Sequence, residues 1–328
     1  MEVLDERVLA GFGIEPKYIR KVKYMYIVKC NRGSFVIRKA DADSKRIMFV
    51  SDIKNGLKRK GFRRFFDFEA AVDGKPYFEL EGANYIMTPS GRDTVSPEYT
   101  REGDFREILR SFGAFHRAGA FGESPEFKDF FGEDIKSVFS TYEERLKRMR
   151  KQVYRKRRLD DIDYIFLKNY EYYYKACEES LEGLEKFGID REEFSARHNG
   201  KIVLNNADEE TMALYPTGVF FNDMLKLEAG TPLKDLRIII NRFLKKNRQP
   251  FLKLSEILEE YGRRSPLSPN AVRLLYYMLI FPERYIKTYW DYYKKGRAFT
   301  PVYVKDSIKR MVEERERDRE YIEEIKGF

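Results

Sequence analysis

The chain has 328 residues, a length that corresponds to about two domains at roughly 150 residues per domain. Hydrophobic residues make up 42% of it, enough for a buried core, and the formal net charge is +9. Lys and Arg are interspersed with Asp and Glu, so this surplus is a modest bias rather than a polycationic arm. Two cysteines (Cys30, Cys177) and two histidines (His116, His198) exclude a disulfide framework and a zinc site of the usual spacing.

The N-terminal residues are acidic and amphipathic, unlike a signal peptide, and no window approaches 18 uncharged apolar residues. We therefore expect a protein of a reducing cytoplasm that does not engage a membrane.

The first ninety residues are rich in strand-forming residues. Two strands joined by a turn at Asn31–Gly33 are predicted between Tyr18 and Ala40. A helix follows, with Ser44 as its cap and an end near Gly61. The turn dipeptides Asp73-Gly74 and Glu81-Gly82 then predict an antiparallel meander with strands at Phe65–Val72, Pro76–Leu80 and Asn84–Thr88.

After Ser90-Gly91 the sequence changes to long helical segments that flank a second β-like region, Ser195–Leu225. Helices are expected at Glu102–Ala118, Ile135–Ala176 (one or two), Leu233–Lys246, Lys253–Tyr261, Pro269–Tyr293 and Val304–Ile325. The predicted architecture is α+β and bilobed: a small antiparallel β lobe with one helix at 1–90, then a mainly helical lobe at 91–328 with an embedded hairpin at about 195–225. This order is that of a protein-kinase-like fold.

A phosphotransferase of that fold needs a catalytic base, a metal-binding Asn, a metal-binding Asp after a hairpin and a strand Lys. His198 and Asn205 stand seven residues apart, as in the pattern HxDxxxxN, but Gly200 occupies the position of the base. Asp223 ends an apolar strand where the second metal ligand belongs. Asn205 and Asp223 are therefore the candidate metal ligands of an otherwise degenerate catalytic loop.

The strand Ser34–Lys39 carries Arg38 where the pattern expects Lys. Lys39 is adjacent but faces the other side of a regular strand. Arginine keeps the charge but replaces a compact ammonium with a planar fork, so Arg38 and Lys39 are candidates for a vestigial nucleotide site. On the following helix the Glu expected to face the strand Lys is missing, and Asn55 is the nearest match.

Six segments together resemble one family: Phe12–Ile14, Gly33–Arg38, Asp73–Tyr77, Asn84–Thr88, Phe112–Ala118 and Pro232–Leu236. The chain resembles the CotS-type spore coat proteins, a bacterial family similar to aminoglycoside and choline phosphotransferases, over about residues 8–300. The resemblance implies synthesis in the mother-cell cytoplasm, deposition in the spore coat and other spore coat proteins as partners. It also implies ATP and Mg²⁺ as candidate ligands.

A positioned base contributes about 10²- to 10⁴-fold to a rate, and here the base, the strand Lys and its Glu partner are all altered. We therefore expect a pseudokinase that acts as a structural or assembly protein of the spore coat, not an enzyme. The alternative is a Mg-ATP-dependent small-molecule phosphotransferase in which Asn205 and Asp223 hold the metal and Lys39 substitutes for Arg38. An RNA-associated protein is a third reading, based on charge alone.

Two groups of residues each allow two interpretations. Nine Lys or Arg fall within Arg145–Arg158, which is either a solvated helical face or a docking surface for an acidic partner. Nucleic acid is not expected there, because no RNP-type motif or zinc finger accompanies the charge. Four tyrosines at helical spacing are expected to pack in the core, with a cross-linked surface as the alternative: Tyr285, Tyr289, Tyr292 and Tyr293. His116 is expected to be a packing residue.

Overall fold

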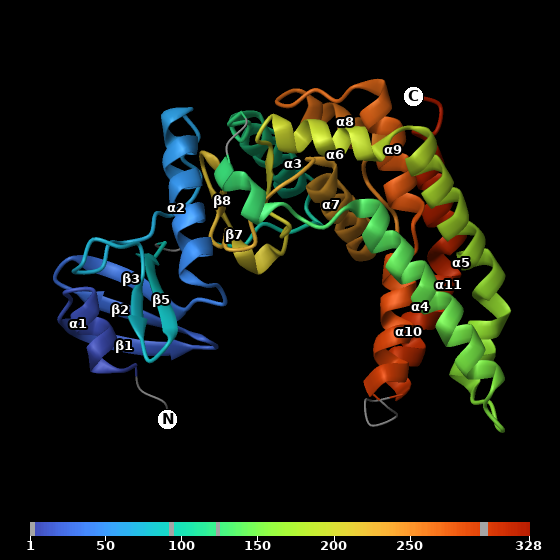
Figure 1. The fold of residues 1–328 in the computed structure, drawn as a ribbon, viewed down its shortest axis with the longest axis horizontal. Helices are drawn as coiled ribbons and strands as arrows, with labels where there is room; N and C mark the ends of the chain where they lie inside the picture. The colour runs from blue at the N-terminus through green and yellow to red at the C-terminus, as the bar shows by residue number, and fades with distance from the viewer. Residues whose placement is uncertain (1–3, 92–94, 123–124, 296–300) are drawn as a thin grey trace. The chain divides into compact units, whose positions relative to one another are not determined.

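The computed structural model describes residues 4–91, 95–122, 125–295 and 301–328, which form two compact units (Figure 1). The first unit comprises Met1–Phe130 and Asn199–Ala229, and the second comprises Phe131–His198 and Gly230–Phe328. The first unit therefore combines the predicted β lobe with the region of the catalytic-loop hairpin. These units do not follow the division predicted at residue 90, and that lobe boundary stays a prediction.

A five-stranded antiparallel sheet with the order β1-β2-β3-β5-β4 forms the β-rich part of the first unit. The region from Tyr18 to Ala40 holds three strands instead of the predicted two, because the chain also turns at Lys23-Tyr24. Lys23 adopts a left-handed φ of 52° there, a conformation that composition alone did not signal. The strands are β1 (Pro16–Val22), β2 (Met25–Cys30), β3 (Gly33–Lys39), β4 (Phe78–Leu80) and β5 (Ala83–Pro89).

Two helices accompany this sheet, α1 (Glu6–Gly11) and α2 (Ser44–Arg59). Side chains of α1 share a hydrophobic core with Phe35 and Ile37 of β3. The cap of α2 is Asp43 rather than the predicted Ser44, since the Asp43 carboxylate accepts a hydrogen bond of 2.8 Å from the backbone N–H of Arg46. The predicted helix is confirmed, and the four apolar residues that recur along it at spacings of three or four are all buried: Ile47, Val50, Ile53 and Leu57.

The strand predicted at Phe65–Val72 is wrong. This segment forms one isolated parallel bridge, between Phe65 and Phe221, and single backbone hydrogen bonds instead of a ladder. One of its carbonyls, that of Phe66, accepts a hydrogen bond from the Lys54 ammonium. Its alternating apolar residues therefore pack as an irregular segment whose backbone groups bond to several different elements.

The rest of the first unit is built on α3 (Glu102–Ala118), whose bounds agree with the prediction. His116 is buried against the rings of Phe112 and Phe115, as expected of a packing residue. The second β-like region contains a short hairpin and a second two-stranded pair. These elements, with two 3-10 turns, are η1 (Pro125–Phe130), β6 (Ile202–Val203), η2 (Glu209–Thr211), β7 (Met212–Tyr215), β8 (Gly218–Phe221) and β9 (Glu228–Ala229).

Every named element within the described residues of the second unit is a helix, and α4 packs against both α5 and α10 (Figure 1). The helix predicted at Pro269–Tyr293 is interrupted at Phe281-Pro282, because proline has no N–H to continue the backbone ladder. The helices are α4 (Ile135–Tyr154), α5 (Asp161–Lys186), α6 (Ile189–His198), α7 (Leu233–Lys246), α8 (Leu254–Gly262), α9 (Pro269–Ile280), α10 (Glu283–Lys295) and α11 (Pro301–Glu323).

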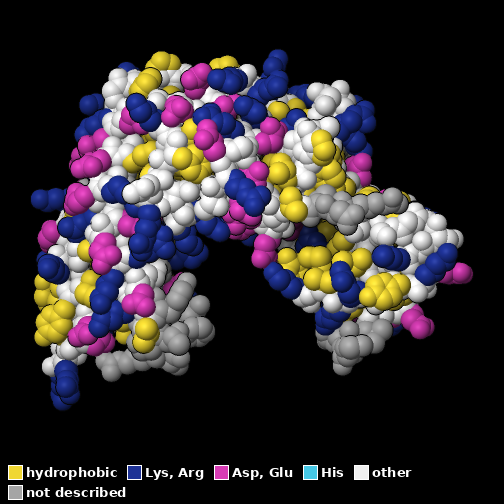
Figure 2. Space-filling view, turned by 180° about the vertical axis from the view of Figure 1, so that it is seen from behind, with side chains coloured by type: hydrophobic (Ala, Val, Ile, Leu, Met, Phe, Trp, Pro, Cys, Tyr) yellow, Lys and Arg dark blue, Asp and Glu magenta, His cyan; other side chains and the backbone are white. Residues whose placement is uncertain are grey.

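The tyrosine stripe on α10 lies mainly in the core of this unit. Tyr285, Tyr289 and Tyr292 are buried, and the Tyr289 ring lies 4.9 Å from that of Phe166 on α5. The prediction of core packing is thereby confirmed for these three side chains. The visible face in Figure 2 shows Lys and Arg interspersed with Asp and Glu, in keeping with a modest charge bias. None of the described helices is both long and apolar enough to span a lipid bilayer.

Candidate functional site

The strand β3 brings Arg38 into contact with Asp223. Because strand side chains alternate, Arg38 lies on the face opposite Phe35 and Ile37. Its guanidinium Nη2 lies 2.9 Å from Asp223 Oδ1, and the two side chains are 15% and 31% exposed. The same Oδ1 accepts a hydrogen bond of 3.0 Å from the backbone N–H of Leu225. The carboxylate of Asp223 is thus compensated by groups of this chain.

A second cation approaches this pair from α2. Lys54 is only 4% exposed, and its Nζ donates a hydrogen bond of 2.8 Å to the carbonyl of Phe66. The ammonium also lies 3.5 Å from the centre of the Phe68 ring. Burial lowers the pKa of Lys54 to about 7, although the charges of Asp67 and Asp223 favour its protonated form.

Sequence reasoning missed Lys54 and selected its neighbour Asn55, which is exposed. Lys54 lies on the buried face of α2, four residues after Val50 and three before Leu57. This spacing on the apolar stripe was the available signal, but a lysine in such a stripe is usually placed at its solvent edge. The helix that should present an acid toward the strand cation therefore presents a second cation.

Packing also leaves no room for a side chain at residue 200, where the pattern expects the catalytic base. Gly200 has a φ of +57°, and a Cβ built on it would lie 2.2 Å from the carbonyl oxygen of Gly122. Two backbone hydrogen bonds hold these segments together, from Phe121 to Gly200 at 3.1 Å and from Gly122 to Asn199 at 3.0 Å. In this conformation the position cannot carry an aspartate or any other side chain.

The remaining predicted site residues lie on three different segments of the chain. Asn205, in the first unit with Asp223, has a φ of 51°, and its amide donates a weak hydrogen bond of 3.5 Å to the carbonyl of Lys226. Lys39 is exposed on a strand with regular register, on the face opposite Arg38. His198 is the last residue of α6 in the second unit, with its ring 6.2 Å from that of Phe194.

The fit of these residues to a magnesium nucleotide is poor. Mg²⁺ prefers carboxylate oxygens, but Asp223 already accepts from both Arg38 and Leu225. A divalent cation at Asp223 would compete with a partly buried guanidinium for Oδ1 and would be repelled by the charge of Arg38. Among the residues that the structure describes, no group of three or more His, Cys, Asp or Glu is placed to bind a metal.

Comparison with known proteins identifies the family of this chain. The family model "Spore coat putative kinase YutH" matches residues 5–325, nearly the whole sequence. The chain belongs to this family. The resemblance to CotS-type spore coat proteins is thereby confirmed. A search of curated proteins found no significant match.

Solved structures show the fold of this family member. An aminoglycoside phosphotransferase from Alicyclobacillus acidocaldarius superposes with a TM-score of 0.89 at 14% identity, over 100% of this chain and 96% of that chain. The AMP-bound spectinomycin phosphotransferase APH(9)-Ia gives 0.66 at 13% identity, with 93% of both chains covered. Amicoumacin kinase hAmiN, in complex with AMP-PNP and Ca²⁺, gives 0.63 at 12% identity, over 97% of this chain and 92% of that one. The predicted kinase-like fold is confirmed.

Proposed function

We propose that this member of the spore coat kinase-like family is a pseudokinase that serves the coat as a structural or assembly protein. The ion pair between Arg38 and Asp223 carries the proposal. A guanidinium bound to this carboxylate competes for it with the metal of a magnesium nucleotide. Removing either partner would leave a partly buried charge uncompensated, so the pair resists opening.

Two further features support the loss of chemistry. The backbone of Gly122 fills the space in which a base at residue 200 would stand. Lys39, the residue that the phosphotransferase alternative requires as a replacement for Arg38, lies on the opposite side of β3. Each of these three alterations alone would weaken phosphoryl transfer. The change at the strand Lys affects positioning, the Arg38–Asp223 pair affects metal binding, and Gly200 affects proton transfer.

A thermal-shift titration of the full chain with ATP and MgCl₂, separately and together, tests this proposal. A pseudokinase closed by Arg38 should show no Mg²⁺-dependent rise of its unfolding midpoint, because only ligands of the folded state raise it. A rise that requires both ligands, is lost in Asp223→Ala and is accompanied by ADP formation would instead establish the phosphotransferase alternative. Glu210→Ala, a change of an exposed carboxylate in the same unit, is the matched control.

In this reading the protein is made in the mother-cell cytoplasm and then joins other coat proteins in the spore coat.

We further propose that the Lys and Arg residues at Arg145–Arg158 contribute to docking an acidic partner. About half of them are engaged within the chain, as in the pairs of Lys147 with Glu143 and of Lys156 with Asp163. Four others are exposed and available to a partner: Lys151, Arg155, Arg157 and Arg158.

Binding of polyglutamate to the full chain tests this docking surface. Arg157→Glu with Arg158→Glu should weaken binding about tenfold at low salt, and added salt should reduce the difference. Charge reversal at two exposed cations elsewhere in the same unit, Lys168→Glu with Arg264→Glu, should have a smaller effect. Equal losses in the two double variants would assign polyglutamate binding to net charge and remove the docking surface.

A further inference from the structure

The strand β1 lies at one end of the five-stranded sheet. Among the described residues β2 is the only strand that pairs with it, so no strand of the chain covers its outer side (Figure 1). The register between β1 and β2 is regular from Tyr18 to Val22. The outer backbone groups of such an edge strand can pair with another extended chain, which then joins the sheet as a further strand.

The two ends of this sheet differ in length and exposure. The strand at the other end, β4, has only three residues and packs against α1. Five of the seven residues of β1 are exposed. Natural proteins protect exposed edges of this kind from unwanted pairing, often with charged side chains. Lys17, Arg20 and Lys21 serve this purpose in β1, which has no acidic residue, so a second copy of β1 would meet like charges.

The positive charge extends over the three strands that follow one another from Pro16 to Lys39. This segment contains eight Lys or Arg and no Asp or Glu, whereas the whole chain has 63 basic and 54 acidic residues. Acidic residues from other parts of the first unit pair with three of these cations: Glu210 with Lys23, Glu69 with Arg32 and Asp223 with Arg38.

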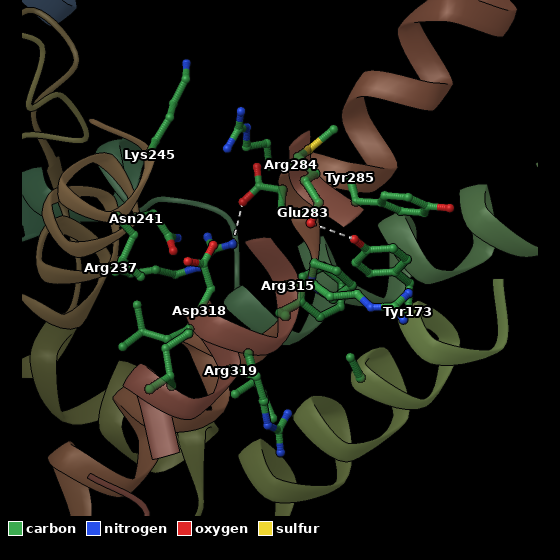
Figure 3. A pocket seen from close by; sticks show the side chains of 18 of the residues that line it. Tyr173, Arg237, Asn241, Lys245, Glu283, Arg284, Tyr285, Arg315, Asp318 and Arg319 are labelled. Atoms are coloured by element: carbon green, nitrogen blue, oxygen red, sulfur yellow. Dashed lines mark hydrogen bonds and ion pairs between the residues drawn. The ribbon is translucent and has the colours of Figure 1, made fainter. Parts of the chain in front are cut away.

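Cations of the second unit provide a contrast. The pocket in Figure 3 is lined by several Arg side chains, but Arg237 pairs there with Glu283, and Arg319 pairs with Glu179. Carboxylates of the chain itself therefore already compensate these two guanidinium groups. An excess of lysine and arginine attracts an anionic partner only where such internal pairs are missing.

Three cations at the β1 edge have no such internal pair. Lys17, Arg20 and Lys29 are exposed, and no ion pair joins any of them to an acidic residue that the structure describes. Tyr18 is the register partner of Lys29, so Tyr18, Arg20 and Lys29 lie on the same face of the sheet. The edge therefore combines unpaired backbone on its outer side with uncompensated positive charge on one face.

We propose that β1 binds an extended acidic segment of another protein as a further strand of the sheet. Backbone hydrogen bonds along Tyr18–Val22 hold the segment, and its carboxylates, at alternate positions, lie beside Arg20 on the face that also carries Lys29. Complementary charge selects an acidic strand and rejects a second copy of β1. This binding mode rests on the proposed assembly role for its use in the coat, but not on the loss of kinase chemistry.

The experiment measures binding of a short dye-labelled peptide of alternating Glu and Thr to the full chain by fluorescence anisotropy. We expect saturable binding. Lys17→Glu with Arg20→Glu should weaken it by about tenfold or more, because the peptide then meets two carboxylates in place of two cations. Both side chains are exposed, so these changes should leave the fold intact.

The matched control is Lys45→Glu with Arg59→Glu, which makes the same charge change at two exposed positions of α2. It should weaken binding less than about threefold, since these charges are screened from the β1 edge. Arg157→Glu with Arg158→Glu should have an equally small effect, which separates this edge from the docking surface of the second unit. A loss in either control equal to that in the β1 variant would overturn the proposal, as would a lack of saturable binding.

Pairing through the backbone is tested on the peptide itself. N-methylation of alternate amides removes hydrogen-bond donors from one edge of an extended peptide and keeps its charge. Methylation of one alternate set should weaken binding by about tenfold or more, and methylation of the other set should change it little. Equal effects of the two sets would overturn strand addition, and tighter binding of a single-stranded oligonucleotide of equal charge would assign the edge to nucleic acid instead.

These measurements need neither ATP nor Mg²⁺. Failure of peptide binding would therefore leave the pseudokinase proposal standing, and a Mg²⁺-dependent nucleotide shift would overturn that proposal without affecting the β1 edge.

Discussion

Arg38 of β3 forms an ion pair with Asp223, and Lys54 of α2 places a second, buried cation within electrostatic reach of that pair. Arg38 pairs with it directly at 2.9 Å, and the buried Lys54 ammonium is influenced by both members of the pair. An active kinase-like site is expected to combine a cation on the strand with an acid on the helix. Here the strand and the helix each present a cation, Arg38 and Lys54. This arrangement leads to the first two predictions.

Arg38 and Asp223 should be energetically coupled. In a double-mutant cycle of Arg38→Met and Asp223→Asn, each single change should destabilise the protein, and the double change should cost less than their sum. We expect a coupling free energy on the order of 1 to 2 kcal/mol, measured by urea denaturation at low salt. Additive effects would contradict a structural role for the pair.

Lys54 should make stability depend on pH. Its pKa is about 7 in the folded state, below the ordinary value of 10.5, so the unfolded chain binds more protons between these values. The contribution of Lys54 to the free energy of unfolding should therefore rise from about pH 7 toward pH 10.5. Lys54→Met should flatten the increase between pH 7 and pH 9, and Lys45→Met, an exposed position on the same helix, should not. Parallel pH profiles for the two variants would refute the assignment.

Gly200 should tolerate no side chain. Gly200→Ala is expected to destabilise the protein by more than about 2 kcal/mol, because left-handed strain of about 1–2 kcal/mol is joined by the contact with the Gly122 carbonyl. Gly74→Ala isolates the strain alone, since Gly74 also has a positive φ but faces open space. Equal losses in chemical denaturation would show that the loop moves aside and that the base position is open.

Tyr289 should contribute to stability through its ring. Tyr289→Ala should cost about 3 to 5 kcal/mol, because it removes a fully buried aromatic side chain packed against Phe166 and Tyr285. Tyr289→Phe keeps the ring and should change the free energy of unfolding by less than about 1 kcal/mol. A large loss in both variants would assign the effect to the hydroxyl instead.

The sequence by itself determined the fold class and the family, and it located most helices. The periodicity of α3 and α7 gave their bounds, since a helix depends mainly on neighbours three and four residues away. It also placed Gly200 and Arg38 in the catalytic pattern, because that pattern is a matter of spacing along the chain.

Only the tertiary structure decided what these residues contact. Arg38 and Asp223 are 185 positions apart, and the approach of Gly122 to Gly200 joins two distant loops. Packing between elements remote in sequence also decides that Lys54 is buried while Asn55 is exposed. It likewise decides that Phe65–Val72 forms an irregular segment instead of a strand. Local patterns report which face of an element is apolar, but the partner of a charged side chain is set by the packing of the whole unit.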